Sequence, residues 1–220
     1  MHVHTTRGST DSGLSPAELV AVAVELKLDG VCITEHGENW SEAELRELAG
    51  GTGLALFSGR EIETDVGHVL AIGLLRYEAG LHRFAALAEY AAKNGVALVL
   101  AHPFRHHTDP PAGQTCLLTA GLPEPPAGAE ALAKAIPELA QVHAIEAANG
   151  ATSQADNELA AAIAGVVGSP TTGGSDAHSA HGIGSGLTRV NGEPRSSAEL
   201  AEAIRAGITN AVIERPGGSS

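Results

Sequence analysis

Hydrophobic and polar positions along this chain alternate between short apolar runs and longer stretches of helical periodicity. Strand-like and helix-like segments follow one another almost throughout, which predicts an α/β fold with a parallel sheet. The expected strands cover residues 2–4, 31–34, 54–58, 68–73, 96–101, 142–147, 171–174, 183–190 and 210–214. The expected helices cover residues 16–28, 41–49, 81–93, 129–135, 153–164 and a last segment that begins near residue 197.

Local signals mark where these segments begin and end. Ser15, Pro16 and Glu18 together have the form of a capping box with proline in the first helical position. Gly95 is placed to end the helix over 81–93. Residues 105–128 are rich in Pro and Gly, and a loop of that length in a compact domain is usually a lid, a binding loop or disordered.

Length and composition favour one domain. A chain of 220 residues with 43% hydrophobic residues can bury a sizeable core. Because only 3% of the residues are aromatic, that core must be built mainly from Ala, Val, Leu and Ile. We expect a single domain over residues 1–215 and a flexible tail over 216–220. The net charge of −13 argues against binding along a nucleic-acid backbone, which requires a basic surface.

The two cysteines and the hydropathy bear on the compartment. Cys32 lies in an apolar run and is expected to be a small buried residue, and no CxxC pair is present. The chain has no visible signal peptide and no apolar run of membrane-spanning length. These features predict a reduced, cytoplasmic protein that does not bind a membrane.

Four short segments with histidine stand at or just past expected strands. They are His2-Val3-His4-Thr5, Thr34-Glu35-His36, Ala101-His102-Pro103 and Ser175-Asp176-Ala177-His178. Since residues i and i+2 of a strand face the same side, His2 and His4 can present two imidazoles to one ion. Asp176 and His178 have the same spacing, and such mixed donors suit Zn²⁺, Mn²⁺ or Fe. Because α/β barrels place their active sites at the carboxyl ends of strands, the four segments together predict a metal centre there.

These segments resemble the motifs of the polymerase and histidinol phosphatase (PHP) superfamily of metal-dependent phosphoesterases. Gly59-Arg60-Glu61 and Gly67-His68-Val69-Leu70 are similar to its intervening metal-binding segments, in matching order from residue 2 to about residue 186. The resemblance implies a distorted (β/α)7 barrel with its active site at the C-terminal ends of the strands. It also implies two or three divalent ions (Mn, Zn or Fe) with the following ligands: His2, His4, His36, Glu61, His68, His102, Asp176 and His178.

Three positions qualify this resemblance. Asp11 is the candidate for a ninth ligand, with a turn residue as the alternative reading. Met1 directly precedes His2, whereas the family usually has several residues ahead of its first motif. We therefore expect an almost absent first strand, a trimmed start, and a frayed terminus that would loosen one metal. Glu35 replaces the more frequent Asp. We expect its carboxylate to orient the imidazole of a metal-binding histidine; the alternative is a plain surface carboxylate.

The resemblance implies hydrolysis of a small phosphomonoester or short nucleotide through a metal-bound hydroxide. This reaction needs a nucleophile at neutral pH and positive charge on the phosphoryl oxygens, and clustered metals supply both. We expect catalytic roles for Asp176, His178 and Glu61, with Glu61 as the bridging ligand because its two oxygens can reach two ions. The candidates for substrate binding are Arg105, Arg7 and His181, each with a solvated loop side chain as the alternative.

Other functions remain open at this point. A metal-dependent exonuclease or proofreading module is opposed by the acidic charge, which makes long nucleic acid an unfavourable partner. A non-catalytic metal-stabilised binding module is opposed by the complete set of ligands. A metal-dependent amidohydrolase usually needs a carboxylated lysine, and the three lysines, Lys27, Lys93 and Lys134, fall on expected helices. The leading expectation is a small phosphorylated substrate, with the oligomeric state left open.

Overall fold

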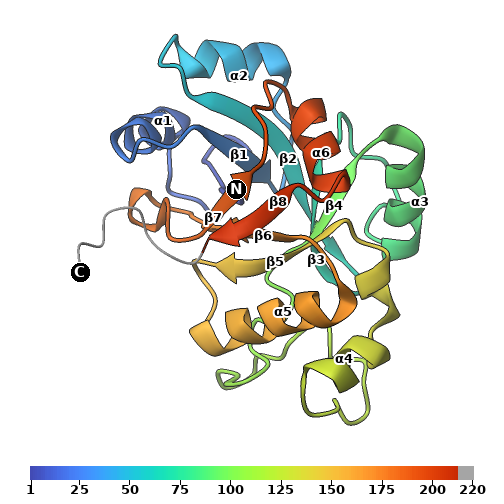
Figure 1. Cartoon of the computed structure of the whole chain (residues 1–220). Coiled ribbons are helices and arrows are strands. Elements are labelled where there is room, and N and C mark those ends of the chain that lie inside the picture. Colours follow the sequence, from blue (N-terminus) through green and yellow to red (C-terminus); the bar gives the residue numbers. More distant parts are fainter. Residues whose placement is uncertain (213–220) are drawn as a thin grey trace.

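The computed structural model describes residues 1–212 and has a curled six-stranded sheet with helices arranged around it (Figure 1). The sheet strands are β1 (Gly30–Glu35), β2 (Ala55–Thr64), β3 (Gly67–Ile72), β4 (Ala97–Leu100), β5 (Ala144–Asn149) and β6 (Thr171–Gly174). A separate antiparallel pair is formed by β7 (Leu187–Val190) and β8 (Thr209–Val212). The helices are α1 (Pro16–Glu25), α2 (Glu42–Ala49), α3 (Phe84–Asn94), α4 (Ala129–Ala135), α5 (Gln154–Val167) and α6 (Ser197–Arg205), with short 3-10 turns at Pro137–Ala140 and Ala180–Gly182.

The sheet is mixed, which corrects the expected all-parallel arrangement. The strands follow one another in sequence order, with β1–β2, β4–β5 and β5–β6 parallel but β2–β3 and β3–β4 antiparallel. The physical reason is the short link between Thr64 and Gly67, since two residues can close a hairpin but not a parallel crossover. The strand β2 also continues to Thr64, so Glu61 lies inside it and not just past its end.

The first residues of the chain join the two edges of this curled sheet. Val3 accepts a hydrogen bond from the Thr34 N–H of β1 at 2.8 Å, and it forms an isolated parallel bridge with Ala177. The His2 carbonyl accepts from the Asp176 N–H, just beyond β6, at 2.7 Å. The strand expected over residues 2–4 is therefore a single bridge. The described sheet is a six-stranded half-barrel, which matches the implied (β/α)7 barrel only in part.

The helices confirm the capping signals and differ at their ends. Ser15 accepts a hydrogen bond from the Glu18 N–H at 3.2 Å at the start of α1, which forms one half of the expected capping box. The helix α1 ends at Glu25, earlier than expected, because Lys27 adopts a left-handed φ of 56°. No helix or strand occurs between β4 and α4, so the long irregular loop is confirmed. No described helix is both long and apolar enough to cross a membrane.

The core is aliphatic, as the composition predicts. The largest cluster packs α3 and α5 against the sheet through residues such as Leu87, Leu98, Ile145 and Ile163. Cys32 is buried in a second cluster with α6, and this burial raises the pKa of its thiol to about 12, which fits a structural residue. Residues 213–220 lie outside the described part, so the end of the last expected strand, the domain boundary at 215 and the tail over 216–220 stay predictions.

Close backbone approach at β6 generates a first prediction. A Cβ atom added to Gly173 would lie 2.1 Å from the Leu187 carbonyl oxygen, a backbone atom that cannot move freely. We expect Gly173→Ala to lower the free energy of unfolding by about 2 kcal/mol and Tm by about 4–8 °C, measured by thermal denaturation. The matched control is Gly165→Ala inside α5, where nothing lies within 4 Å of the added atom. That substitution should stabilise the helix by about 0.5–1 kcal/mol, and equal melting of the two variants would contradict the prediction.

Candidate metal centre

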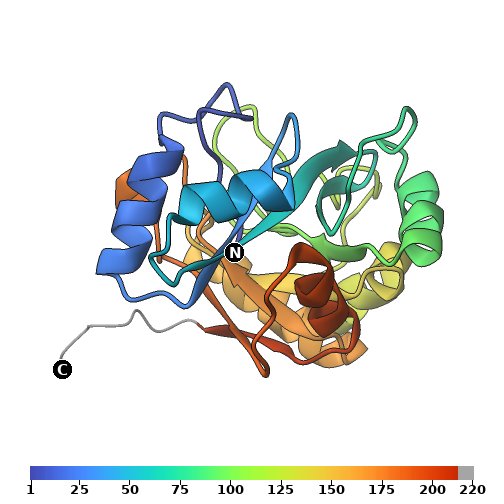
Figure 2. The same ribbon diagram turned by 90° about the horizontal axis from the view of Figure 1, so that it is seen from above.

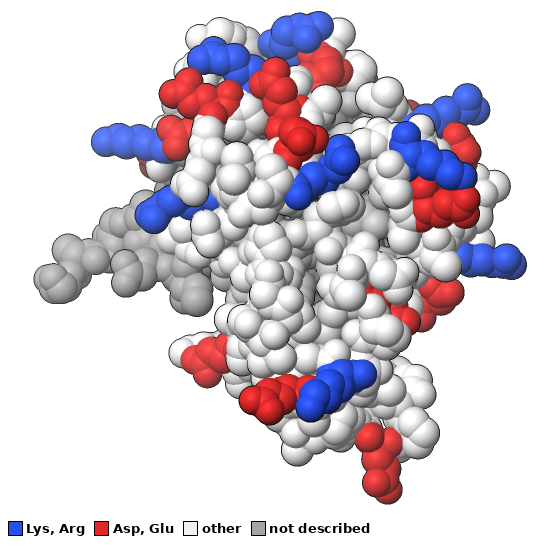
Figure 3. All heavy atoms as spheres, turned by 45° about the vertical axis from the view of Figure 1, so that its right-hand side comes forward, with Lys and Arg blue, Asp and Glu red and all other residues white. Residues whose placement is uncertain are grey.

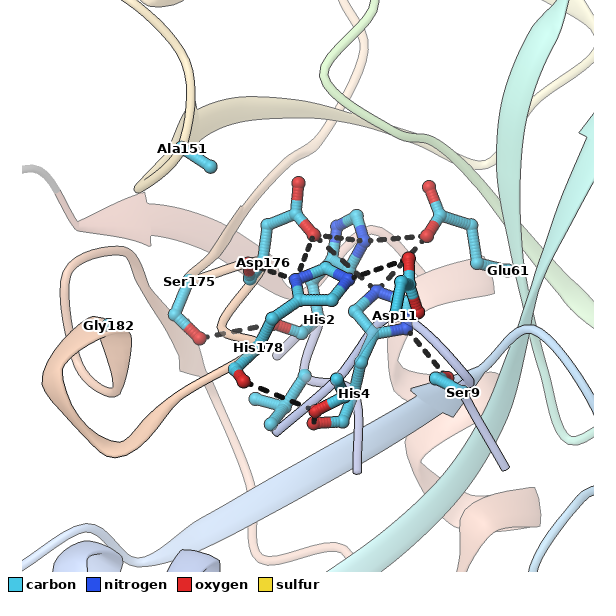
Figure 4. A network of polar contacts seen from close by, with 12 residues as sticks. His2, His4, Ser9, Asp11, Glu61, Ala151, Ser175, Asp176, His178 and Gly182 are labelled. Carbon is cyan, nitrogen blue, oxygen red and sulfur yellow. Dashed lines mark hydrogen bonds and ion pairs between the residues drawn. The ribbon is translucent and has the colours of Figure 1, made fainter. Parts of the chain in front are cut away.

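The structure brings all nine expected metal donors together at one end of the curled sheet. They come from the N-terminal segment, the ends of β1 and β4, the β2–β3 hairpin and the segment after β6. Seen from above, the loop that precedes α1 and the loop that follows β4 lie at the same end of the sheet (Figure 2). In the close view the side chains of His2, His4, Asp11, Glu61, Asp176 and His178 turn toward one another (Figure 4). Three groups of side chains have donor atoms close enough to hold an ion.

Glu61 lies between two of these groups. Its Oε2 atom is 3.2 Å from His2 Nε2 and 3.1 Å from His4 Nε2. Its Oε1 atom is 2.8 Å from His68 Nδ1 and 3.0 Å from His102 Nε2. Each oxygen of the one carboxylate therefore faces its own pair of imidazoles, which is the arrangement that a ligand bridging two ions requires.

Asp176 completes the group around His2 and His4. Its Oδ1 atom lies 3.5 Å from His2 Nε2 and 3.4 Å from His4 Nε2, on the same side as Glu61 Oε2. Two imidazoles and two carboxylates thus surround one point, a donor set that suits Zn²⁺, Mn²⁺ or Fe.

The third group consists of His4, His36 and His178 and lies nearest to solvent. The rings of His36 and His178 both stack on His4 with centroids 4.4 Å away. Asp11 Oδ2 lies 3.4 Å from His36 Nε2 and 3.3 Å from His178 Nε2, and its side chain is 54% exposed. Asp11 lies in a turn, as the alternative reading has it, and its carboxylate also faces this third group.

An orphaned buried atom tests whether these residues fit a metal ion. His4 Nε2 is buried and has no hydrogen-bond partner among the described residues, although Glu61 Oε2 lies 3.1 Å away. An unsatisfied buried nitrogen is costly, and coordination to a cation would satisfy its lone pair. The other ring nitrogen, Nδ1, lies 3.2 Å from the Ser9 hydroxyl oxygen, which leaves Nε2 directed at the centre. The donor chemistry and this atom fit a divalent ion.

The backbone around the centre is held in an unusual conformation. Non-glycine residues with positive φ include His2 at 61°, His102 at 29° and Asp176 at 51°. Such conformations cost about 1 kcal/mol or more each and persist only where surrounding contacts impose them. Three expected ligands share this strained backbone. The contacts of their side chains, and not regular strand geometry, therefore set the backbone conformation at these positions.

Opposing effects of burial and charge set the ionisation of the centre. Burial alone would lower the pKa of His2, but the carboxylates of Glu146, Glu61 and Asp176 outweigh it and raise that pKa well above its ordinary value. Burial would raise the pKa of Glu61, but His2, His102 and His4 hold it well below its usual range. The pKa of Asp176 is likewise lowered against burial by nearby histidines and an arginine. Both carboxylates are therefore anionic and attract cations.

Sequence reasoning missed Glu146, which lies behind the centre on β5. Its carboxylate is fully buried, and its Oε1 accepts from His2 Nδ1 at 2.9 Å. Its Oε2 accepts from the His102 backbone N–H at 2.8 Å and from Asn149 Nδ2 at 2.9 Å. These bonds direct His2 Nε2 into the cluster. The available signal was a single charged residue inside the otherwise apolar run over 144–148.

Glu35 does not make the expected direct contact with a histidine of the cluster, but reaches one through another side chain. It is fully buried, which excludes a surface carboxylate, and it accepts from the Ser9 hydroxyl at 2.7 Å and from the Thr5 N–H at 3.0 Å. Ser9 in turn contacts His4 Nδ1 at 3.2 Å. Glu35 therefore supports an imidazole through Ser9 and not by direct contact.

The three expected substrate-binding residues fall in different places. Arg105 donates to Asp176 and, at 3.0 Å, to Asn149 Oδ1, so it borders the cluster. The Arg7 guanidinium instead lies 4.2 Å from the Trp40 ring centroid and pairs with Glu44 at 2.6 Å. His181 is exposed on the 3-10 turn after Asp176, and within residues 1–212 its side chain makes no hydrogen bond or ion pair. Of the three, Arg105 alone contacts a side chain of the donor cluster in the described part of the chain.

Comparisons with known proteins agree with this geometry. A family model described as PHP-associated matches residues 154–209, which include Asp176 and His178. A comparison with curated proteins finds no match. Among solved structures, a two-domain protein from Bacteroides vulgatus containing a predicted PHP-like metal-dependent phosphoesterase superposes with a TM-score of 0.65 and 23% identity. That likeness covers 96% of this chain and 63% of the other, so this chain spans less than two thirds of its length.

Two further structures share the fold over most of both chains. PsfC from Pseudomonas syringae superposes with a TM-score of 0.65 and 22% identity, over 97% of this chain and 90% of the other. A predicted metal-dependent phosphoesterase from Bifidobacterium adolescentis gives a TM-score of 0.57 and 18% identity, over 92% and 94% of the two chains. At these identities the likeness shows a common fold.

The hydrogen bonds of Glu146 generate a prediction about metal binding. Glu146→Ala removes the group that orients His2, and we expect it to weaken Mn²⁺ binding about 10- to 100-fold, measured by equilibrium dialysis. Glu146→Gln keeps the shape and one acceptor oxygen, so its loss should be smaller. The control is Glu89→Ala, which removes an exposed carboxylate from α3. Unchanged Mn²⁺ affinity in a folded Glu146→Ala protein would contradict the prediction.

Proposed function

We propose that this chain is a member of the PHP superfamily, and that it is a metal-dependent phosphoesterase that hydrolyses a small phosphomonoester or a short nucleotide. The observation that carries the proposal is the position of Glu61. Its two oxygens face separate pairs of imidazoles at 2.8–3.2 Å, and such a shared carboxylate is typical of centres that hold adjacent ions for phosphate chemistry.

The donor groups support a centre of three divalent ions, with two as the smaller alternative. The first ion would be held by His2, His4, Glu61 and Asp176, the second by Glu61, His68 and His102, and the third by His36, His178 and Asp11. Divalent ions held there would neutralise the phosphoryl oxygens and activate water as a nucleophile near neutral pH. Mixed nitrogen and oxygen donors favour Mn, Zn or Fe.

The side chains around the donors have roles of their own. Arg105 is held by the Asn149 and Thr152 oxygens at 3.0 and 3.1 Å, with its guanidinium beside Asp176. These contacts use Nε and Nη2 of the guanidinium, which leaves the N–H groups of Nη1 to donate to a phosphoryl oxygen and orient the ester. His178, with its side chain one-third exposed, is placed to move a proton between the centre and solvent.

The exonuclease alternative is not favoured by the surface. The face in Figure 3 carries interspersed acidic and basic side chains without a continuous basic stripe. Together with the net charge of −13, this disfavours binding along a long nucleic-acid backbone. A short nucleotide needs no such stripe and stays within the proposal.

The proposal predicts Mn²⁺-dependent phosphatase activity that requires His178. The assay would use an aryl phosphate, histidinol phosphate, nucleoside monophosphates, a bisphosphorylated nucleotide and a short single-stranded DNA, with phosphate release or strand length as the readout. We expect at least one small ester to be hydrolysed, and His178→Ala to lower kcat/KM by about 10³-fold or more while melting like the wild type.

The control for that variant is His82→Ala, because His82 is an exposed loop histidine away from the donors. It should keep full activity. Cleavage of the DNA alone would favour the exonuclease, and Mn²⁺ binding without turnover of any compound would favour a binding module.

A separate prediction concerns Arg105. Because its guanidinium borders the centre without belonging to the donor groups, Arg105→Ala should raise KM about tenfold or more and leave Mn²⁺ affinity nearly unchanged. Arg105→Lys keeps the charge but not the planar fork, so it should recover only part of the loss. An unaltered KM, measured on the best ester of the panel, would show that Arg105 does not bind the phosphate.

A further inference from the structure

A cavity of about 410 Å³ opens beside the metal centre and extends beyond the donor side chains. Two of its lining residues, His68 and His102, contact Glu61 Oε1 at 2.8 and 3.0 Å, so the cavity begins at the second donor group. Its volume lies in the range of about 300–1,000 Å³ that is typical of pockets for small organic molecules. A phosphate group alone would leave most of it unfilled.

The walls away from the centre are mainly apolar. Their apolar members are Val66 beside the β2–β3 turn, Pro103 after β4, and Leu117 and Leu118 of the long loop, and their polar members are His106, Gln114 and Thr115. Within the described chain, no lining residue is an aspartate or glutamate, whereas Arg105 lies at the edge of the cavity. These walls favour an uncharged apolar group and disfavour an amine, which would find no counter-charge among them.

Internal contacts hold these walls in place. The Cys116 thiol donates to the Pro103 carbonyl oxygen at 3.3 Å, which ties the loop to the segment after β4. Asp156, at the start of α5, accepts from the backbone N–H groups of His106 and Thr108 at 3.0 and 2.9 Å. The cavity is therefore formed before a ligand arrives, which lowers the entropic cost of binding.

We propose that this cavity binds the organic part of the substrate, and that the substrate is the phosphomonoester of an uncharged, largely apolar alcohol. The inference rests on the proposed phosphoesterase function and extends it to the leaving group. The phosphoryl group lies at the metal centre beside Arg105, and the alcohol lies between Val66, Pro103 and Leu117. Hydrolysis adds the oxygen of water to phosphorus, breaks the phosphorus–oxygen ester bond, and leaves the alcohol, with its proton, in the cavity.

The test compares three alkyl phosphates whose leaving groups are all alcohols. They are 2-(1-naphthyl)ethyl phosphate, glycerol 3-phosphate and phosphoethanolamine, assayed by phosphate release with Mn²⁺. Burial of about 100 Å² of ring surface is worth about 2.5 kcal/mol, so we expect kcat/KM for the naphthyl ester to exceed that of the other two about 10- to 100-fold. Comparable values for the three esters would overturn the proposal.

A pair of exposed leucines provides matched variants. Leu117 is 53% exposed and lines the cavity, whereas Leu75 is 90% exposed and is not among its lining residues. Leu117→Gln should lower kcat/KM for the naphthyl ester about fivefold and leave glycerol 3-phosphate unaffected. Leu75→Gln should change neither. An unaffected naphthyl ester in folded Leu117→Gln protein would also overturn the proposal.

A binding measurement separates this inference from the proposed function. Fluorescence titration with 2-(1-naphthyl)ethanol requires neither metal nor turnover. We expect the alcohol to bind the wild type and the Leu75→Gln variant, and to bind the Leu117→Gln variant more weakly. If no ester is hydrolysed but the alcohol binds in this pattern, the phosphoesterase function fails while the cavity assignment stands. If esters are hydrolysed but the alcohol does not bind, the cavity assignment fails alone.

Discussion

The contact of one buried carboxylate with four imidazoles is the interaction on which this site depends. Burying the charge of Glu61 is costly, and the surrounding histidines offset that cost. The antiparallel pairing of β2 and β3 makes the contact possible: Glu61 is opposite Leu70, so His68 is its diagonal neighbour on the same face, and the two side chains meet at 2.8 Å. The departure from an all-parallel sheet is thus a condition for the centre.

Sheet closure and the centre are coupled at the N-terminal segment. The hydrogen bonds that tie this segment to β1 and to the residues after β6 also fix His2 and His4. A Cβ atom at Gly174 would lie 2.4 Å from the Cβ of His2 and 2.1 Å from Glu146 Oε1, so only glycine permits the approach. The same backbone hydrogen bonds therefore join the two edges of the sheet and hold His2 and His4 in the donor cluster.

The sequence predicts the donors better than the backbone that carries them. The four histidine segments, together with the resemblance to the PHP superfamily, name all nine of the side chains that the structure clusters, with Asp11 only as a candidate. The strand assumed for His2 and His4 is not formed, because His2 adopts a positive φ that no periodicity reveals. Glu146 was missed because its partners come from distant segments. Arg7 follows His4 by three residues, but this spacing does not show where the Arg7 side chain points. In the structure its guanidinium lies over Trp40.

The long loop explains why substrate preference is the least readable property of the sequence. It has no helix or strand, so periodicity says nothing about its path, which depends on single contacts such as the one between Cys116 and Pro103. The donors of the centre come from strand ends and neighbouring turns, whereas Leu117 and Leu118 come from this loop. Substitutions in the loop can therefore reshape the cavity without moving a donor, so the lining of the cavity and the donor cluster can vary separately.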